Sequence, residues 1–148
     1  MIQLPLFRID AEGTGTEINY RIHYIDPLRY EGNANVCLHY CGSRDSDDPL
    51  HARGFKLRRK LIERGVMEGD YAFKIRAFYP NGGQTYGKPY HVMRQGMGSL
   101  MLERIIKDAL ELDTKLVYLD TIEPEMREFV NKKGFTRVGE TNTYFKLI

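Results

Sequence analysis

This chain of 148 residues has few cysteines, a small net charge and no long apolar run. There are only two cysteines, but a domain of this length buries roughly two-thirds of its unfolded surface and needs neither a disulfide nor a metal to fold. No apolar run approaches the ~20 residues of a membrane span, and the N-terminus lacks the basic and apolar segments of a signal peptide. We therefore expect a single domain over residues 1–148 that is cytoplasmic and has no membrane partner.

The formal net charge is only +2, and the sequence pI is about 8.5. Domains that bind nucleic acid usually carry a much stronger basic footprint, so the sequence predicts no nucleic-acid partner. A mildly basic surface is compatible with an anionic small ligand. The composition indicates no oligomeric state, and a homodimer is the default because two-fold dimers are the commonest assembly.

The two cysteines flank a histidine in an expected strand. Cys37, His39 and Cys41 alternate with other residues, so all three would point to one face. Along a strand, Cys37 and Cys41 would lie roughly 13 Å apart at ~3.3 Å per residue. One metal ion with bonds of ~2.0–2.3 Å cannot join them. Since free cysteine usually behaves as a small hydrophobic residue, we expect two reduced structural thiols and no metal.

Apolar periodicity predicts an α+β (mixed α/β) fold with a central mixed sheet. The expected strands are 2–10, 17–25, 35–40, 71–79, 84–92, 115–120, 135–138 and 143–147. A turn is expected in the glycine-containing cluster 12–15, between the first two strands. The expected helices lie between Asp48 and Gly65, over 99–111 and over 123–132, the last with Pro124 at its start and Gly134 beyond its end.

The first helix is expected to begin with Asp48 as N-cap and Pro49 at the first helical position. The expected apolar face consists of Phe55, Leu61 and Ile62. The basic face consists of Arg53, Lys56, Arg58, Arg59, Lys60 and Arg64. Two interpretations of the basic face stay open: a solvated helix surface, which is typical of charge runs, and attraction of an anionic ligand or partner.

A β-α-β unit is expected in the second half of the chain. Asn81-Gly82 between two alternating runs predicts a hairpin that joins strands 71–79 and 84–92. The apolar stripe of the following helix consists of Met101, Leu102, Ile105, Ile106, Ala109 and Leu110. The continuous apolar run 116–119 is typical of a buried parallel strand, and the crossover should be right-handed.

The segment 94–99, between the second hairpin strand and this helix, contains Gly96 and Gly98. The first N–H groups of a helix have no intrahelical acceptor, and the macrodipole adds roughly half a positive charge there. Glycines let a phosphate approach the backbone. A Walker loop is excluded because no lysine follows Gly98. A dinucleotide fingerprint fails because Met101 replaces its third glycine, although Asp120 follows at a suggestive distance.

Residues 93–102, with the sequence MRQGMGSLML, resemble the signature of the GNAT superfamily of N-acetyltransferases. That signature is Gln or Arg, two residues, Gly, one residue, and Gly or Ala. Residues 119–121 (LDT), 124–126 (PEM) and 129–135 (FVNKKGF) resemble a second block of the family, which usually ends Leu-Tyr-x-Lys-x-Gly-Phe. The likeness covers about residues 84–148, in the order in which the family has these blocks.

The resemblance implies a GNAT-like fold, with a mostly antiparallel twisted sheet that splays open near the glycine loop. It implies that acetyl-CoA binds as a cosubstrate, with its pantetheine arm along residues 88–93 and its pyrophosphate on the loop. The cofactor-binding residues would be Met93, Arg94, Gln95, Gly96, Met97, Gly98 and Ser99. The family transfers acetyl to an amine by direct attack on the thioester, so the implied partners are acetyl-CoA and an amine acceptor that the sequence does not identify.

The sequence departs from the family at two positions. Met93 stands where the signature usually has Gln or Arg, and Val130 stands where the family often has a tyrosine that protonates the departing thiolate. Tyr144 and Tyr118 are candidates for that acid, and His91 is a candidate base because an unperturbed histidine titrates near 6.5. Two functions therefore stay open: an N-acetyltransferase, and a catalytically weak acyl-CoA-binding sensor or partner-binding module.

Overall fold

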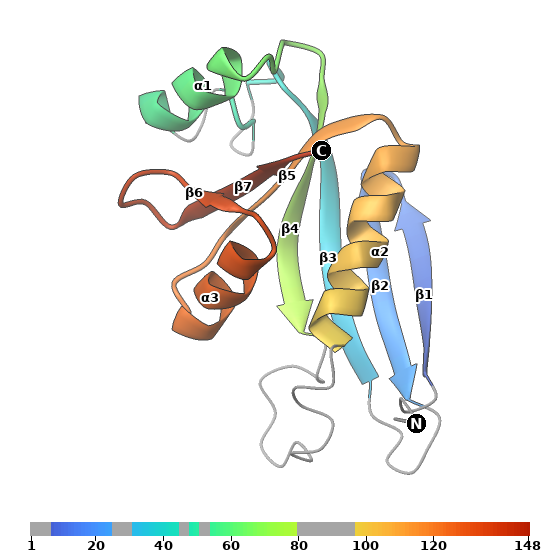
Figure 1. Ribbon diagram of the computed structural model, residues 1–148. Helices are drawn as coiled ribbons and strands as arrows, with labels where there is room; N and C mark the ends of the chain where they lie inside the picture. Colours follow the sequence, from blue (N-terminus) through green and yellow to red (C-terminus); the bar gives the residue numbers. More distant parts are fainter. Residues whose placement is uncertain (1–6, 25–30, 45–47, 51–53, 80–96) are drawn as a thin grey trace.

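The computed structural model describes residues 7–24, 31–44, 48–50, 54–79 and 97–148. Seven strands form one sheet in the order β1-β2-β3-β4-β5-β7-β6, and three helices pack on it (Figure 1). The strands are β1 (Phe7–Thr14), β2 (Glu17–Tyr24), β3 (Glu31–Tyr40), β4 (Tyr71–Tyr79), β5 (Thr114–Asp120), β6 (Thr136–Arg137) and β7 (Thr143–Leu147). The helices are α1 (Gly54–Glu63), α2 (Met97–Glu111) and α3 (Pro124–Lys132). This mixed sheet with three helices confirms the predicted fold class.

Of the strand pairs in the sheet, only β4 with β5 is parallel. Helix α2 makes the crossover between these two strands, so the structure has a β-α-β unit of β4, α2 and β5, whereas the predicted unit began with strand 84–92. The strand that pairs with β5 in parallel is β4, at 71–79. The predicted hairpin turn at Asn81-Gly82 and the predicted strand 84–92 lie outside the described residues.

The turn between β1 and β2 is tighter than the sequence suggested. Thr14 pairs with Glu17, and Gly15 has a φ of 60° in the two-residue connection. Two-residue hairpin turns need positive φ, which glycine adopts without strain. The prediction that the first strand ends at residue 10, before a turn over 12–15, was therefore wrong, because the ladder runs on to Thr14.

Asp48 does not cap a helix. Its buried carboxylate accepts hydrogen bonds of 2.9–3.0 Å from the backbone N–H groups of Gly42, Arg44 and Leu50. It thus organises the connection after β3, and Pro49 and Leu50 form a turn. The predicted helix start at Asp48 was wrong because the side chain expected to cap the helix binds the preceding loop instead.

Helix α1 presents Leu57 and Leu61 to the core, while Ile62 is half exposed. The prediction that Ile62 belongs to the apolar face was therefore wrong. The predicted end of the helix is confirmed, because Gly65 follows it with a φ of 89° and the N–H of Val66 returns to the carbonyl of Leu61. This arrangement is typical of a glycine that ends a helix in the left-handed region.

Helix α2 buries Met101, Leu102, Ile105 and Ala109 as predicted, but Leu110 is 56% exposed. Leu110 therefore lies beyond the edge of the stripe that the sequence had assigned. Helix α3 begins at Pro124 as predicted, and Gly134 follows it with a φ of 87°. The final hairpin of β6 and β7 is also confirmed.

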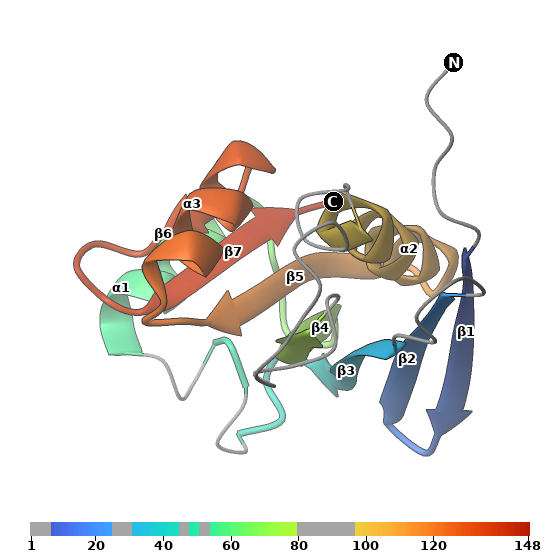
Figure 2. The same ribbon diagram turned by 90° about the horizontal axis from the view of Figure 1, so that it is seen from below.

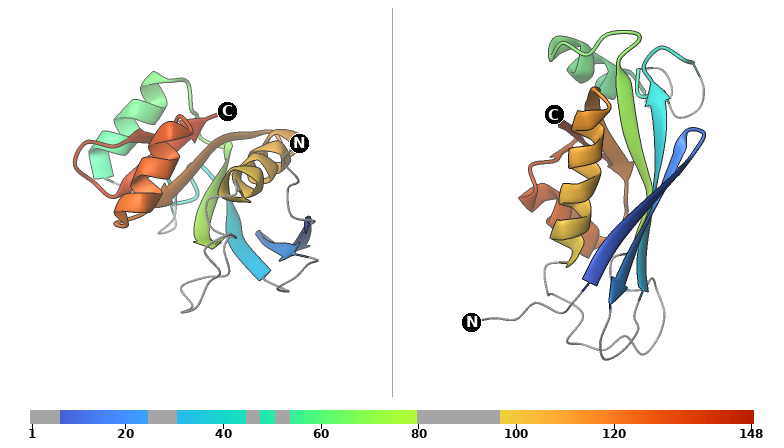
Figure 3. Two further views of the ribbon diagram at one scale, coloured as in Figure 1. Left: turned by 60° about the horizontal axis from the view of Figure 1, so that its bottom comes forward. Right: turned by 90° about the vertical axis from the view of Figure 1, so that its right-hand side faces the viewer.

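The two faces of the sheet carry separate cores. Helices α2 and α3 cover one face, and α1 covers the other face near β5 and β7 (Figure 2; Figure 3, left). Along β5, Val117 and Leu119 belong to the first core, while Leu116 and Tyr118 belong to the second. No helix in the described part of the chain is long and apolar enough to cross a membrane.

Candidate active site between two diverging strands

Strands β4 and β5 separate partway along their length. Their parallel pairing runs from Tyr71 opposite Thr114 to Lys74 opposite Tyr118. Beyond this point β4 continues to Tyr79, and among the described strands it pairs there with β3 alone. The register of β4 against β3 shifts at the same place, where Arg76 is the extra residue of a β-bulge. Bulges bend a strand and are frequent next to active sites.

A cavity of about 210 Å³ occupies the opening between the two strands. Residues 75–79 of β4 form one wall, residues 119–123 form the other, and Met126 of α3 closes one side. The cavity is therefore bounded by the two strand ends and by the start of α3. We call it the strand cleft.

The two sides of the strand cleft differ in character. Ile75 and Leu119 belong to the apolar core under α2 and α3, and Met126 packs against that core. Asp120 follows Leu119, so its side chain points to the opposite face of the sheet. Arg76 also lies on that face, where it contacts Glu17 at 2.8 Å and the Cys37 sulfur at 3.1 Å. One side of the cleft is thus apolar and the other is charged.

Asp120 is held in place by its neighbour across the sheet. It pairs with Thr143 of β7, and the Thr143 hydroxyl donates a hydrogen bond of 2.7 Å to the Asp120 carboxylate. The next residue, Thr121, donates its N–H to the carbonyl of Asn142 at 2.9 Å and accepts a bond from the Arg127 guanidinium at 3.1 Å. This rim of the cleft is therefore tied to both β7 and α3.

Sequence reasoning had considered Asp120 as the acid of a dinucleotide site and as part of the second family block, but had not placed it among the catalytic candidates. One signal could have found it. The residue follows a continuous apolar run that is typical of a buried parallel strand, and ligands of α/β units bind at the carboxyl ends of such strands. Its hydrogen bond to Thr143 depends on the fold and has no sequence signal.

The N-terminus of α2 lies beside the carboxyl end of β4 (Figure 1). The helix begins at Met97, two residues before the predicted start, so Gly98 and Ser99 lie in its first turn. That turn contains no acidic residue, and its N–H groups lack intrahelical acceptors. This end of the helix is therefore suited to an anion. The other predicted cofactor-binding residues, Met93 to Gly96, lie outside the described part of the chain.

The three predicted catalytic residues have different positions. Tyr144 is 2% exposed, pairs with Leu119 and lies in the core under α2 and α3, on the same face of the sheet as the apolar side of the strand cleft. It does not line the cleft itself. Tyr118 is fully buried in the core on the opposite face. His91 lies outside the described residues. Val130 is fully buried in the same core as Tyr144, which gives it a packing role.

Helix α2 is fixed to the sheet by a polar contact in the first core. The buried Tyr20 hydroxyl of β2 donates a hydrogen bond of 2.8 Å to the Asp108 carboxylate, which also accepts from Arg104 at 3.2 Å. Burial, followed by the hydrogen bond and charge of Asp108, raises the pKa of Tyr20 far above its ordinary value. The hydroxyl therefore stays protonated as a donor.

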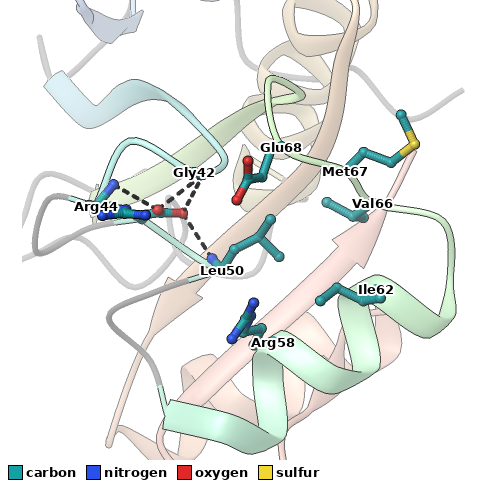
Figure 4. Close-up of a pocket in the computed structure, with 9 residues that line it drawn as sticks. Gly42, Arg44, Leu50, Arg58, Ile62, Val66, Met67 and Glu68 are labelled. Carbon is teal, nitrogen blue, oxygen red and sulfur yellow. Dashed lines mark hydrogen bonds between the residues drawn. The ribbon is translucent and has the colours of Figure 1, made fainter.

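A second cavity of about 410 Å³ lies between α1 and the loops on either side of it (Figure 4). Its walls include Arg44, Arg58, Ile62 and Glu68, and the carboxylate of Asp48 organises one of the loops. Because residues 66–68 of its wall precede the amino end of β4, this cavity lies at the end of that strand away from the cleft.

The two cysteines are free and buried, as predicted. Burial, followed by the negative charges of Asp48 and Asp70, raises the pKa of Cys41 to about 12, so this thiol keeps its proton at neutral pH. Among the described residues, no three His, Cys, Asp or Glu side chains are grouped as metal ligands.

No protein-family model and no curated protein matches the chain. Solved structures do. AtaT complexed with acetyl-methionyl-tRNAfMet has a TM-score of 0.57 at 11% identity, over 89% of this chain and 71% of that one. A tyrosine-to-phenylalanine mutant of KacT has a TM-score of 0.59 at 9% identity, with the same coverage. AtaTR bound with acetyl-CoA has a TM-score of 0.55 at 12% identity, over 89% and 70%.

These likenesses establish the fold. The chain has the GNAT-like mixed sheet of AtaT and KacT, and the predicted fold is confirmed. The AtaT complex contains a tRNA, so the expected absence of a nucleic-acid partner stays a prediction for this chain.

Proposed function

We propose that this protein is an acetyl-CoA-dependent N-acetyltransferase that transfers the acetyl group to a primary amine by direct attack. The observation that carries the proposal is the divergence of β4 and β5 beyond Lys74 and Tyr118, beside the N-terminus of α2. A solved structure with this fold, AtaTR, binds acetyl-CoA. The sequence blocks 93–102 and 119–135 independently resemble acetyltransferase signatures.

In this proposal the pantetheine arm lies in the strand cleft. Beyond Lys74, none of the described strands pairs with the β5-facing edge of β4, and an extended amide-containing arm can hydrogen-bond to such an edge as an added strand does. The pyrophosphate binds the loop 93–99 and the first turn of α2, where N–H groups and the helix dipole favour an anion. The apolar side chains of Ile75, Leu119 and Met126 exclude water from the thioester.

The chemistry needs a neutral amine and a proton for the leaving thiolate. The amine nitrogen attacks the thioester carbonyl carbon, the C–N bond forms, and the C–S bond then breaks. Of the predicted proton donors, we favour Tyr144, because it lies on the face of the sheet that forms the apolar side of the cleft. Tyr118 lies across the sheet from that side. His91 remains a proposed base.

Two measurements test the function. The first is the thermal shift with acetyl-CoA: a ligand at 100 times its Kd stabilises by about 2.7 kcal/mol, which for a protein of this size raises the Tm by roughly 5–10 °C. The second is release of the coenzyme A thiol with a panel of primary amines, including an aminoacyl-tRNA because AtaT is found with acetyl-methionyl-tRNAfMet.

The outcomes separate the two candidate functions. A thermal shift together with thiol release that depends on the amine supports the transferase. A thermal shift without turnover on any amine favours the acyl-CoA-binding sensor. We consider this function because the buried Val130 stands where the resembled family often has a tyrosine. If even high acetyl-CoA leaves the Tm unchanged, both candidates are wrong about the ligand.

A further inference from the structure

Asp120 is the last residue of β5 and lines the strand cleft from the face opposite α2 and α3. Asp120 is exposed, whereas residues 116–119 before it on the strand are buried. It therefore stands where the apolar slot between the strands opens to solvent.

The carboxylate is preorganised there. Thr143 is 7% exposed and donates its hydroxyl proton to Oδ1 of Asp120 at 2.7 Å. The backbone on either side is also fixed, since Asp120 pairs with Thr143 and the Thr121 N–H binds the carbonyl of Asn142. A group that is fixed by packing and by a neighbouring hydrogen bond can hold a reacting partner without a further loss of conformational entropy.

The two reactants reach the strand cleft from different sides. The anion-binding end of α2 is on the helix-covered face, so the acyl donor occupies that side and the slot. The acceptor must then approach from the other face, which carries Asp120. Two further charged side chains line this part of the cleft: Arg76, which forms an ion pair with Glu17 at 2.8 Å, and Glu123.

We propose that the Asp120 carboxylate binds the protonated acceptor amine and takes its proton, and that Thr143 positions this carboxylate. This inference rests on the proposed acetyltransferase function and names the acceptor class, a primary alkyl amine that is cationic at neutral pH. Alkyl ammonium groups like that of lysine have an unperturbed pKa of about 10.4, so nearly every acceptor molecule arrives with a proton that must be removed before attack.

The proton balance is complete with Asp120 as the base and Tyr144 as the acid. The ammonium transfers one proton to Asp120 and becomes the neutral amine. The amine nitrogen attacks the thioester carbonyl carbon, the C–S bond breaks, and the Tyr144 hydroxyl protonates the coenzyme A sulfur. The second amine proton then replaces the proton that Tyr144 gave up. Asp120 then releases its proton to water. The products are the amide, coenzyme A as the thiol, and one proton.

The test compares Asp120→Asn with the control Glu125→Gln, which removes one negative charge from an exposed residue of α3 that does not line the cleft. We expect Asp120→Asn to lower kcat/KM for an alkyl amine by about 10²–10⁴-fold, the usual effect of losing a general base. The Kd for acetyl-CoA should stay unchanged. The loss should be much smaller with hydroxylamine, which is mostly unprotonated at neutral pH. Glu125→Gln should change the alkyl-amine rate little.

The hydroxyl of Thr143 is tested separately. Thr143→Val removes the donor and should lower the alkyl-amine rate, whereas Thr143→Ser keeps the donor and should restore it. In the Asp120→Asn background, Thr143→Val should add no further loss, because residues that act as a unit are not additive. Melting temperatures of all variants report whether each one is folded.

Several outcomes would overturn the assignment. Full activity of Asp120→Asn would do so, as would equal losses of activity in Asp120→Asn and Glu125→Gln, or an equal loss of activity with hydroxylamine and with the alkyl amine. If the unaltered protein binds no acetyl-CoA and transfers no acetyl group, the proposed function itself is wrong, and this result is distinct from all of the preceding ones.

Discussion

The Tyr20 hydroxyl of β2 donates a hydrogen bond to the Asp108 carboxylate of α2 across 88 residues of sequence. The two side chains join the sheet to the helix whose N-terminus stands beside the strand cleft. A hydrogen bond to a charged partner contributes about 1.5–3 kcal/mol. Removing it should therefore lower the stability of the whole domain and loosen the helix.

Tyr20→Phe should lower the free energy of unfolding by about 1.5–3 kcal/mol in urea titrations at pH 8, since the Asp108 carboxylate loses its buried donor. The stability of the unaltered protein should also fall faster than that of the variant as the pH rises above 10. The unfolded state then loses the Tyr20 proton while the folded state keeps it, because the pKa of this hydroxyl is raised on folding. Parallel pH profiles for the two proteins would contradict this assignment.

Two glycines with positive φ form a matched pair. Gly42 and Gly65 have φ values of 91° and 89°, but a Cβ on Gly42 would lie 3.0 Å from Glu68, whereas a Cβ on Gly65 meets nothing within 4 Å. Gly65→Ala should therefore lower the free energy of unfolding by about 1–2 kcal/mol, for its backbone conformation alone. Gly42→Ala should lower the free energy of unfolding further, because the Glu68 side chain must also move. Thermal unfolding of both variants measures this difference in stability, and equal losses of stability would show that Glu68 moves freely.

Filling the strand cleft should block acetyl-CoA. Met126 lines the cleft from α3, so Met126→Trp adds an indole ring to the slot and should abolish the thermal shift with acetyl-CoA. Met67→Trp is the control, because Met67 is 66% exposed and lines the second cavity. It should leave the thermal shift intact. Unchanged acetyl-CoA binding by Met126→Trp would place the cosubstrate elsewhere.

Tyr144 and Tyr118 lie on opposite faces of the sheet, and their replacement by phenylalanine should affect the rate of acetyl transfer differently. Tyr144→Phe should lower kcat by about 10²–10⁴-fold if its hydroxyl protonates the leaving thiolate, with the Kd for acetyl-CoA unchanged. Tyr118→Phe should leave kcat within a fewfold range, because its ring lies in the core under α1. A coenzyme A release assay on both variants decides between them, and a larger effect at Tyr118 would reverse the assignment.

The elements that the sequence predicted well are those whose signals are local. Strand β5 was predicted from the apolar run 116–119, and helix α3 was predicted from Pro124 and Gly134. These signals are reliable because periodicity, proline and glycine act within one or two turns of the chain. Leu110 and Ile62 were misplaced because the width of an apolar stripe depends on what packs against it. Both side chains are at least half exposed.

The start of α1 and the hydrogen bond between Asp120 and Thr143 could not be predicted for a different reason. An aspartate before a proline satisfies the rule for a helix cap. Asp48 instead accepts hydrogen bonds from the backbone amides of Gly42 and Arg44, which precede it in the sequence, whereas the expected helix follows it. The Asp120 carboxylate accepts a hydrogen bond from Thr143, which lies 23 residues away on another strand. Both outcomes depend on which backbone or side-chain groups the fold brings together.

Strand β4 has different pairing partners at its two ends. Up to Lys74 it has neighbours on both sides, and beyond Lys74 none of the described strands pairs with its β5-facing edge. Edge strands normally invite pairing with other chains, and proteins protect them by covering them. Here that edge faces β5 across a cavity of about 210 Å³, which Met126 closes on one side. We expect a recessed edge of this kind to accept a slender extended molecule more readily than a polypeptide with side chains on both faces.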